Sequence, residues 1–503
     1  MLHYYKLTKL GGDLNKQIDL CAKRMGLSDY SADNIFQPKS YEWYGDWEGR
    51  TLLAMQCLYN YLGVEPKYYK EINDAIPMHI NWYGYFGPVV DKDNINEQQF
   101  AGNSWYLRYL CSAYENNKNE NILSTIHKLT NNLYIKHKTE ISNYIYNSKM
   151  INDKDFATGH LSGKVGNWNL SSDVGCIFIS LDGLSHSYQI TKDKNTEDLI
   201  DSLVDIFSTI GTTNNNMQTH AFLSGIRGLV RYYESTKKPK VLNLAKEYFD
   251  YYLKSSINFV YENFGVINKY SGSEGCAVID SAMLCIQFFN ITNDNRYLSL
   301  FRKIYENAIR VAQRGNGGFG CNVGVWKNNY YLESVKEFAE ANWCCTMRGC
   351  EGMTYIAQNL FSVRDNTITV ILPNDCIAEF FNGKVVLKVK TDYPNAGKTT
   401  FEVLKCDVPF TLNFNLLDSY KTNANKTEFK FEKPSTVVVE HTGIIVKRVL
   451  FNKNGYEYGD MVLAEALTSD NVFEIDGKKM QRLISFASVK IEDTFKIKQR
   501  VLF

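Results

Sequence analysis

The sequence lacks a surplus of charge, a long apolar run and a clear export signal. Its formal net charge is +1 over 503 residues, which gives no electrostatic reason to expect nucleic acid or an anionic membrane as a partner. No apolar run approaches transmembrane length, and residues 1–10 lack the continuous apolar core of a signal peptide. We therefore expect a cytoplasmic protein without a nucleic-acid or membrane partner.

Several familiar signatures are also missing. The chain has no phosphate loop, no Ser-His-Asp order and no dinucleotide fingerprint, and it has only 8 histidines. Its 12 cysteines follow no disulfide-framework spacing, which indicates a reducing compartment where thiols stay free for metal binding or catalysis. With 44% apolar and 22% charged residues, the composition is that of a soluble globular protein, and the length predicts two or three domains.

Two short cysteine-bearing segments carry most of the chemical information. Glu274 and Cys276 lie in Ser-Glu-Gly-Cys-Ala, and the neighbours Cys344 and Cys345 lie in Asn-Trp-Cys-Cys-Thr. One carboxylate and three thiolates suit a tetrahedral Zn²⁺, and neighbouring cysteines rarely form a disulfide with each other. The pair is a metal clamp, a reactive thiol with a helper, or ordinary core packing, since cysteine is often buried as a small hydrophobe. The residues alone leave these interpretations open.

The first two-thirds of the chain predict repeated helical hairpins. Apolar residues recur at helical spacing, and several of these segments are followed by a polar turn and a second amphipathic helix. The clearest examples are residues 52–61, 107–115, 222–233 with 241–249, and 282–289 with 297–305. Their irregular spacing and long glycine- and tryptophan-bearing inserts favour a closed ring whose loops build one pocket. We predict an (α/α)₆ barrel over residues 1–362, with an open helical solenoid as the alternative.

The pattern changes near Asp365 to short segments that partly alternate between apolar and polar residues. These segments are residues 367–372, 384–390, 410–415, 428–431 and 436–440. Short strands separated by Asn, Gly, Pro and Asp clusters predict an antiparallel β-sandwich over residues 363–503. A helical barrel followed by a β-sandwich recurs in enzymes acting on carbohydrate, but a fold alone does not supply a function.

Together these segments resemble the β-L-arabinofuranosidases of glycoside hydrolase family 127. Glu274-Gly-Cys276 resembles the family's Glu-Thr-Cys segment, and Cys344-Cys345 resembles its Cys-Cys-Pro-Pro-Asn segment. Thr391-Asp-Tyr-Pro394 with Gly397 resembles its Thr-Asp-Tyr-Pro-x-x-Gly segment. Thr219-His-Ala221 is similar to a His-Ala helix start in that family. The order agrees along the chain and covers most of the barrel and the start of the sandwich.

The resemblance implies a retaining glycoside hydrolase that acts on a small carbohydrate or glycoside with a zinc-bound cysteine. By position, Cys344 is the nucleophile, and Glu274, Cys276 and Cys345 hold Zn²⁺ with it. Metal coordination keeps a thiol in the thiolate form that attacks. The family's acid/base lies in Glu-Ala-Phe-Gly, so the resemblance assigns that role to Glu262 in Glu-Asn-Phe-Gly.

Rival carboxylates and departures from the family pattern modify these expectations. Glu340 and Glu337, just before the cysteine pair, are the rival acid/base candidates. Pro-Pro-Asn is replaced by Thr-Met-Arg, so Arg348 is expected to recognise a substrate carboxylate with its planar fork. The substrate sugar therefore stays open. Cys321 and Cys350 either lie close to the site or serve as packing residues, and packing is the favoured interpretation.

Aromatic and histidine side chains complete the predicted substrate contacts. His220 opens a predicted helix and is expected to bond a sugar hydroxyl, with a structural polar role as the alternative. Trp343 adjoins the cysteine pair and is expected near the metal. Trp47, with Trp43, Asp46 and Arg50, is expected to form a stacking rim for a sugar, although aromatic residues that open a core helix are equally common.

Two other functional classes stay open at this point. Helical barrels of this type also host sugar epimerases and isomerases, which would use histidine chemistry without a metal. An inactive relative would hold a purely structural zinc, with four protein ligands and no reachable sulfur. A homodimer is also left open.

Overall fold

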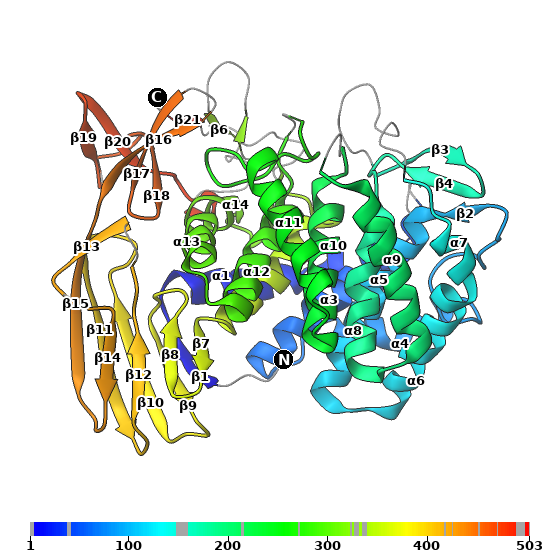
Figure 1. The fold of residues 1–503 in the computed structure, drawn as a ribbon, viewed down its shortest axis with the longest axis horizontal. Helices are drawn as coiled ribbons and strands as arrows, with labels where there is room; N and C mark the ends of the chain where they lie inside the picture. The colour runs from blue at the N-terminus through cyan, green and yellow to red at the C-terminus, as the bar shows by residue number, and fades with distance from the viewer. Residues whose placement is uncertain are drawn as a thin grey trace.

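The computed structural model shows a helical barrel beside a β domain (Figure 1). It describes residues 5–37, 42–146, 159–212, 216–269, 272–321, 324–325, 331–333, 340–416, 419–424, 426–450, 453–469, 471–488 and 498–501. Glu337, one of the rival carboxylates, lies outside these residues.

Six inner helices form a closed ring. Each packs against the next in chain order, and the last returns to pack against the first. The ring consists of α3 (Asp46–Leu62), α5 (Glu97–Asn117), α8 (Ser180–Thr191), α10 (Thr219–Thr236), α12 (Gly275–Thr292) and α15 (Cys345–Ala357). The ring closure rules out an open solenoid and confirms the predicted (α/α)₆ barrel.

An outer layer of helices covers this ring. Five outer helices each follow their inner partner in sequence, whereas the sixth outer helix is α1, which packs against α15. The outer helices are α1 (Gly12–Met25), α4 (Tyr69–His79), α6 (Glu120–Leu129), α9 (Lys194–Ile210), α11 (Pro239–Ser255) and α13 (Asn295–Ile304). Shorter helices are α2 (Ala32–Ile35), α7 (Lys138–Ser142) and α14 (Arg310–Ala312). The first and last helices of the barrel therefore make its sixth hairpin.

Glycines allow the inner helices to approach one another closely. A Cβ atom added to Gly228 of α10 would lie 2.5 Å from the backbone carbonyl carbon of Leu181 in α8. A Cβ added to Gly49 of α3 would lie 2.3 Å from the backbone nitrogen of Tyr106 in α5. Backbone atoms of the neighbouring helix occupy these positions, so a larger residue requires the helices to separate.

The interior of the ring contains buried ion pairs. Arg227 lies 2.9 Å from Asp280, and Arg108 lies 2.9 Å from Asp182 and 3.0 Å from Glu351. All five side chains are buried. Because removing one partner leaves an uncompensated buried charge, these pairs constrain how the inner helices pack.

Helix α12 is the most apolar of the inner helices. It is long and apolar enough to cross a membrane by length and composition alone, and 83% of its 18-residue window is buried inside the protein. The expectation that no run approaches transmembrane length is therefore wrong for this segment. Its contacts with α10, α13 and α15 account for its composition.

Two sheets form the β-sandwich beside the barrel (Figure 1). The antiparallel six-stranded sheet has the order β1 (Tyr5–Leu10), β9 (Cys376–Phe380), β10 (Val385–Thr391), β11 (Gly397–Cys406), β15 (Thr436–Gly443) and β13 (Tyr420–Thr422). The four-stranded sheet has the order β14 (Glu428–Phe431), β12 (Phe410–Asn413), β8 (Thr367–Val370) and β7 (Phe361–Arg364). Phe401 from the first sheet packs on Phe414 beside the second, with ring centroids 4.9 Å apart.

The sandwich confirms the predicted β architecture with two differences. Strands β8 and β12 pair in parallel, whereas the prediction was fully antiparallel. Strand β1 pairs antiparallel with β9, where Tyr5 faces Phe380. Residues 5–10 therefore belong to the sandwich sheet, whereas the sequence assigned residues 1–362 to the barrel alone. The difference arises because β1 forms its hydrogen bonds with a strand that is distant in the sequence. The boundary at residues 362 and 363 otherwise stays a prediction.

A third large sheet, which the sequence did not separate from the sandwich, follows it in the chain. Its five antiparallel strands have the order β16 (Ile445–Leu450), β17 (Lys453–Tyr458), β18 (Met461–Glu465), β20 (Lys478–Arg482) and β19 (Phe473–Ile475). It has a small core of its own, made of Tyr456, Tyr458, Met461, Leu463 and Met480. Two smaller sheets have the orders β2 (Ile95–Asn96), β4 (Trp168–Ser171), β3 (Leu161–Val165) and β21 (Lys498–Arg500), β6 (Tyr331–Glu333), β5 (Gly324–Val325).

Candidate active site

The predicted metal ligands and His220 lie at the N-terminal ends of three inner helices. Glu274 is the N-cap residue of α12, and Cys276 lies in the first turn of that helix. Cys344 is the N-cap residue of α15, and Cys345 is its first residue. His220 lies in the first turn of α10. The partial positive charge at helix N-termini favours thiolates and carboxylates there.

The structure brings three of the predicted ligands into one cluster. The Sγ atom of Cys345 lies 3.4 Å from that of Cys344 and 3.6 Å from that of Cys276. All three sulfurs lie within 4.8 Å of one another, and all three cysteines are free thiols. Three convergent sulfurs are donors that Zn²⁺ prefers, so the residues fit a zinc site.

Glu274 lies beside this cluster rather than within it. Its carboxylate shares a second group of donors, within 4.8 Å of one another, with Cys276 and His220. Gln218 donates a hydrogen bond from its side-chain amide to Glu274 Oε2. Burial and the nearby Cys276 raise the pKa of Glu274 well above its ordinary value. The carboxylate is therefore next to one sulfur and oriented toward Gln218.

The three sulfurs of the cluster shift one another's pKa. Burial opposes ionisation, but hydrogen bonds from Cys344 and Cys345 and the charge of Arg50 hold the pKa of Cys276 well below its ordinary value. The hydrogen bonds with Cys276 raise the pKa of Cys344 and of Cys345 well above the ordinary value of a cysteine thiol. Ionisation of one sulfur thus opposes ionisation of the other two. A bound cation compensates the repulsion that opposes the other two ionisations.

His220 is held by a buried carboxylate. Its Nδ1 lies 2.7 Å from Asp280 Oδ2, and its Nε2 lies 3.3 Å from Arg50 Nη2. Its ring stacks on Trp105 with centroids 5.7 Å apart. His220 therefore lies near the cysteines in a fixed orientation, and its expected contact with a sugar hydroxyl stays a prediction.

Arg348 faces protein carboxylates. Its guanidinium forms ion pairs with Asp280 and Glu351 and lies 4.7 Å from the ring centroid of Trp105. The side chain is almost fully buried. Its expected contact with a substrate carboxylate stays a prediction, and it would require the guanidinium to leave two existing partners.

The predicted tryptophans differ in exposure. Trp343 is 37% exposed beside the half-buried Cys344. Trp47 is half-buried in the first turn of α3, where Asp46 accepts a 2.7 Å hydrogen bond from Arg50. Arg50 also lies 3.8 Å from the sulfur of Cys276. This part of the expected sugar rim therefore adjoins the cysteine cluster through Arg50.

Glu262 lies inside the protein on the loop between α11 and α12. It is 2% exposed, and its backbone N–H donates to Asn258 Oδ1 at 2.9 Å. The buried Arg314 interacts electrostatically with both Glu262 and Cys345, so the two share one positively charged neighbour. These contacts give Glu262 and the cysteine cluster a common neighbour, and the acid/base role stays a prediction.

The five-stranded sheet supports the loop that carries Glu262. The hydroxyl of Tyr261 donates to Glu457 Oε1 of β17 at 2.7 Å. Glu457 also pairs with Lys303 at 2.6 Å and with Arg448 at 3.3 Å. The sheet thus fixes the residue adjacent to the predicted acid/base.

The rival Glu340 is already held by neighbouring side chains. Its Oε1 accepts from Arg24 at 2.7 Å and from Thr346 at 3.0 Å, and its Oε2 accepts from Asn316 at 2.7 Å. These contacts stabilise the segment before α15. They leave Glu340 less suited to exchanging protons with a substrate than a carboxylate that faces a cavity.

The structure adds four residues that sequence reasoning missed or interpreted differently. Asp280 lies one helical turn after Cys276, and Gln218 directly precedes Thr219-His-Ala221, so both positions offered a signal. Asp173 is half-buried, interacts electrostatically with Glu274, and has a pKa raised by burial. No sequence pattern connected Asp173 with the predicted site. Cys321, interpreted as a packing residue, lies 3.3 Å from Cys345 Sγ to Sγ.

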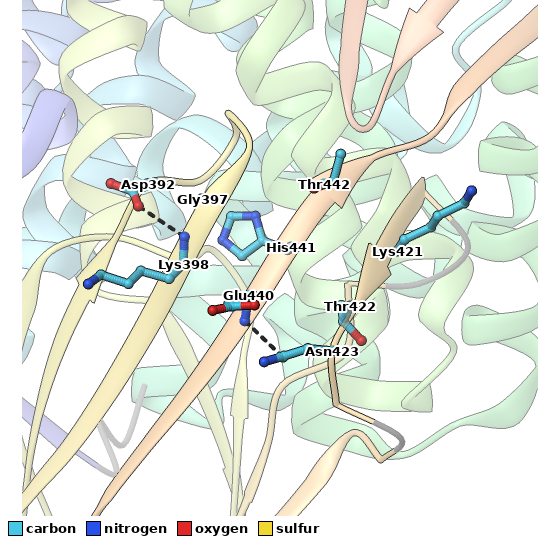
Figure 2. A pocket seen from close by; sticks show the side chains of 9 residues that line it. All are labelled: Asp392, Gly397, Lys398, Lys421, Thr422, Asn423, Glu440, His441 and Thr442. Carbon is cyan, nitrogen blue, oxygen red and sulfur yellow. Dashed lines mark hydrogen bonds between the residues drawn. The ribbon is translucent and has the colours of Figure 1, made fainter.

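A separate hollow lies on the six-stranded sheet (Figure 2), and none of the predicted site residues lines it. Its volume is about 530 Å³. Within it Asp392 accepts a 2.9 Å hydrogen bond from the backbone of Lys398, and Asn423 accepts one of 2.9 Å from the backbone of Glu440. Nearby, Tyr393 of the Thr-Asp-Tyr-Pro segment donates to Asp460 at 2.8 Å. That segment therefore joins two sheets and supplies no group to the cysteine cluster.

Comparison with solved structures places this barrel and sandwich in a known fold. No family model matches the chain, and no curated protein matches it. A β-arabinofuranosidase of glycoside hydrolase family 127 is 12% identical, with a TM-score of 0.64 covering 92% of this chain and 84% of that chain. A family 127 β-L-arabinofuranosidase from Geobacillus stearothermophilus T6 is 11% identical, with a TM-score of 0.63 covering 92% and 86%.

A third structure extends the match over nearly the whole chain. A protein titled glycoside hydrolase is 12% identical, with a TM-score of 0.63 covering 99% of this chain and 94% of that chain. The chain therefore has an (α/α)₆ barrel joined to a β-sandwich. In particular, it has the fold of the family 127 β-arabinofuranosidases.

Proposed function

We propose that this protein is a retaining glycoside hydrolase, similar to the β-L-arabinofuranosidases, that uses Cys344 as a zinc-bound nucleophile. The observation that carries the proposal is the cluster of three sulfurs at the N-termini of α12 and α15. These helices belong to a barrel whose fold is shared with family 127 enzymes.

The donor set supports one zinc site. Zn²⁺ held by Cys276, Cys344, Cys345 and Glu274 would keep the sulfurs ionised at neutral pH and fix their positions. Glu274, whose carboxylate lies within 4.8 Å of the Cys276 sulfur, would be the fourth donor of this set. We expect elemental analysis to find about one Zn²⁺ per chain.

The two neighbouring cysteines differ in access. Cys345 is fully buried, whereas Cys344 is half-buried next to the exposed Trp343. A sugar that stacks on Trp343 therefore reaches Cys344 first. A reachable sulfur favours a catalytic over a purely structural metal site, because a structural site has its ligands enclosed.

The reaction then follows the two steps of a retaining glycosidase. The Cys344 thiolate forms a bond to the anomeric carbon while the glycosidic C–O bond breaks, and Glu262 donates a proton to the leaving oxygen. In the second step Glu262 removes a proton from water. The water oxygen bonds to the anomeric carbon, the C–S bond breaks, and the thiolate of Cys344 is restored.

A covalent-intermediate experiment tests this function. Hydrolysis of a panel of nitrophenyl β-L-arabinofuranosides and related deoxy- and carboxy-sugars should identify a substrate, and the first-formed product should keep its anomeric configuration. Mass spectrometry should find a thioglycoside on the peptide that spans Asn342 to Arg348. Cys344→Ser should abolish turnover and the adduct, whereas Cys345→Ser should mainly weaken metal retention.

Two outcomes would reject parts of the proposal. A product with inverted configuration rules out the covalent mechanism. An adduct that survives in Cys344→Ser and vanishes in Cys345→Ser reverses the roles of the two cysteines.

A further inference from the structure

Cys321 adds a fourth sulfur beside the three predicted metal ligands. The Sγ atom of Cys345 lies 3.3 Å from that of Cys321, 3.4 Å from that of Cys344 and 3.6 Å from that of Cys276. Cys321 therefore supplies the nearest of these three sulfurs to Cys345. Among the described residues, Cys276, Cys344 and Cys345 form the group whose sulfurs all lie within 4.8 Å of one another, and this group does not include Cys321. Cys321 is thus a neighbour of one ligand rather than a fourth member of the group.

Contacts of the residues just before Cys321 and of the start of α15 keep Cys321 close to Cys345. The backbone N–H of Phe319 donates to Thr346 Oγ1 at 3.0 Å, and its carbonyl accepts from the backbone of Ala341 at 2.9 Å. A Cβ atom added to Gly275 would lie 3.0 Å from the carbonyl oxygen of Gly320 and 3.4 Å from Cys345 Sγ. The segment before Cys321 and the start of α15 therefore pack on the same glycine.

The two thiols differ in their access to solvent. Cys345 is fully buried, whereas Cys321 is half-buried. The buried guanidinium of Arg314 is a positively charged neighbour of both sulfurs. A small oxidant from solvent meets Cys321 before Cys345.

We propose that Cys321 and Cys345 form a modification site at which a peroxide produces a reversible disulfide. A peroxide oxidises the thiol of Cys321 to a sulfenic acid, and one water leaves. The sulfur of Cys345 then attacks the sulfenic sulfur, a second water leaves, and the S–S bond forms. Two thiols lose two electrons in total, and the hydrogen peroxide is reduced to two waters.

The geometry favours this pair over the adjacent pair. A disulfide needs a sulfur separation of about 2.05 Å, so Cys321 and Cys345 must approach by roughly 1.3 Å. Cys344 and Cys345 are neighbours in the chain, and a bond between them closes a strained ring. Cys321 and Cys345 are separated by 24 positions, so their bond carries no such constraint.

The functional consequence rests on the proposed zinc enzyme. Oxidation removes Cys345 from the donor set and leaves Cys276 and Cys344 as its only sulfurs. The metal should then dissociate faster, which would make activity sensitive to peroxide and restorable by a thiol reductant together with zinc.

Disulfide mapping after treatment with hydrogen peroxide tests the inference directly. Non-reducing peptide mapping of the full-length protein should show a reducible link between the peptides that contain Cys321 and Cys345. A chromogenic zinc chelator should report metal release in parallel, at least fivefold slower in Cys321→Ser than in the unaltered protein. Cys406→Ser, which changes another half-buried cysteine, should behave like the unaltered protein.

The outcomes separate this inference from the proposed function. A link between Cys344 and Cys345, no link, or equal metal release with and without Cys321 overturns the modification site. If the purified protein holds no zinc, the zinc mechanism fails, but the link between Cys321 and Cys345 is still measured and decides the inference. Cys321→Ala, checked by circular dichroism, replaces Cys321→Ser if that variant does not fold.

Discussion

The carboxylate of Asp280 lies 2.7 Å from Nδ1 of His220, and this buried contact joins the cysteine cluster to the ion pairs inside the barrel. The same carboxylate accepts from Arg227 at 2.9 Å and pairs with Arg348. These cations hold the pKa of Asp280 below its ordinary value despite its burial. The buried side chain of Asp280 thus connects α10, α12 and α15 next to the cysteine cluster.

Asp280→Asn should destabilise the protein strongly. Because it removes an anion shared by two buried guanidinium groups, which then keep more limited pairing with Glu351, we expect a loss of about 3–5 kcal/mol in unfolding free energy. Urea denaturation measures this loss. Asp74→Asn, which removes the exposed partner of Lys70, should have little effect. Similar losses in the two variants would show that the interior ion pairs do not stabilise the barrel.

Glu262→Gln should separate substrates by leaving group. A poor leaving group needs protonation of its oxygen, so we expect such substrates to react about 100-fold more slowly in the variant. The aryl group of an activated aryl glycoside departs with little protonation, so those substrates should be affected much less. Steady-state kinetics with both kinds of substrate measures the difference. Glu340→Gln and Asp173→Asn are the controls. If either control reproduces this selectivity and Glu262→Gln does not, the acid/base assignment moves to that residue.

Trp343→Ala should weaken substrate binding without altering stability. The exposed ring offers a face for a sugar beside Cys344, and its loss should raise KM about tenfold, which corresponds to about 1.4 kcal/mol. Trp82→Ala is the matched control, because Trp82 is also exposed and lies outside the predicted site. Equal KM values for the two variants would remove Trp343 from the substrate contacts.

Gly228→Ala should destabilise the barrel more than Gly225→Ala. The new methyl group at position 228 meets backbone atoms of Leu181 at 2.5 Å, whereas at position 225 it meets the ring of Phe207 at 3.0 Å. A side chain can rotate away and a packed helix cannot, so we expect a loss of about 1–3 kcal/mol only for Gly228→Ala. Thermal denaturation of both variants compares them directly, and the reverse order would contradict the close helix approach.

Glu306 should make stability fall as pH rises. It lies in the π-helical segment Tyr305–Ile309, and burial raises its pKa to about 7 although Arg310 and Arg482 act to lower it. Between about pH 4.5 and 7 the folded protein holds this proton and the unfolded chain releases it. Unfolding free energy should therefore decrease across this window by at most about 3 kcal/mol, with the loss complete above pH 7.

The variant Glu306→Gln isolates this contribution. Glutamine resembles the protonated acid, so its stability should change less between pH 5 and pH 8 than that of the unaltered protein. Urea unfolding at several pH values measures both slopes. Parallel slopes would show that Glu306 does not titrate in this window.

The barrel could be predicted because its helices repeat a local pattern. Apolar residues at helical spacing, followed by polar turns, identify hairpins without any knowledge of the tertiary structure. The cysteine segments were also recognisable, because Cys276 and Cys345 fall at starts of helices and next to other donors. Residues inside the ring were harder to assign. Asp280 and Gln218 act through partners on other helices, and no local pattern distinguishes such contacts from ordinary helix positions.

The β domain was less predictable for a physical reason. Strand pairing depends on hydrogen bonds between segments far apart in the chain, and a short alternating segment does not specify its partner. The sequence therefore identified strands around residues 367–372 and 436–440 but not the separate sheet of β16–β20. The sequence could not decide whether Cys321 lies near the site or only packs, since the sulfur it contacts belongs to a residue 24 positions away.

The pairing of β1 with β9 also constrains the order in which the protein can be completed during synthesis. The ribosome makes β1 before the barrel and β9 after it, so the nascent β1 has no partner while the helices emerge. A chain released after residue 362 contains β1 without β9, and a chain that begins at residue 363 contains β9 without β1. Neither fragment can form the six-stranded sheet, so separate expression of the two parts leaves a strand edge unpaired in each.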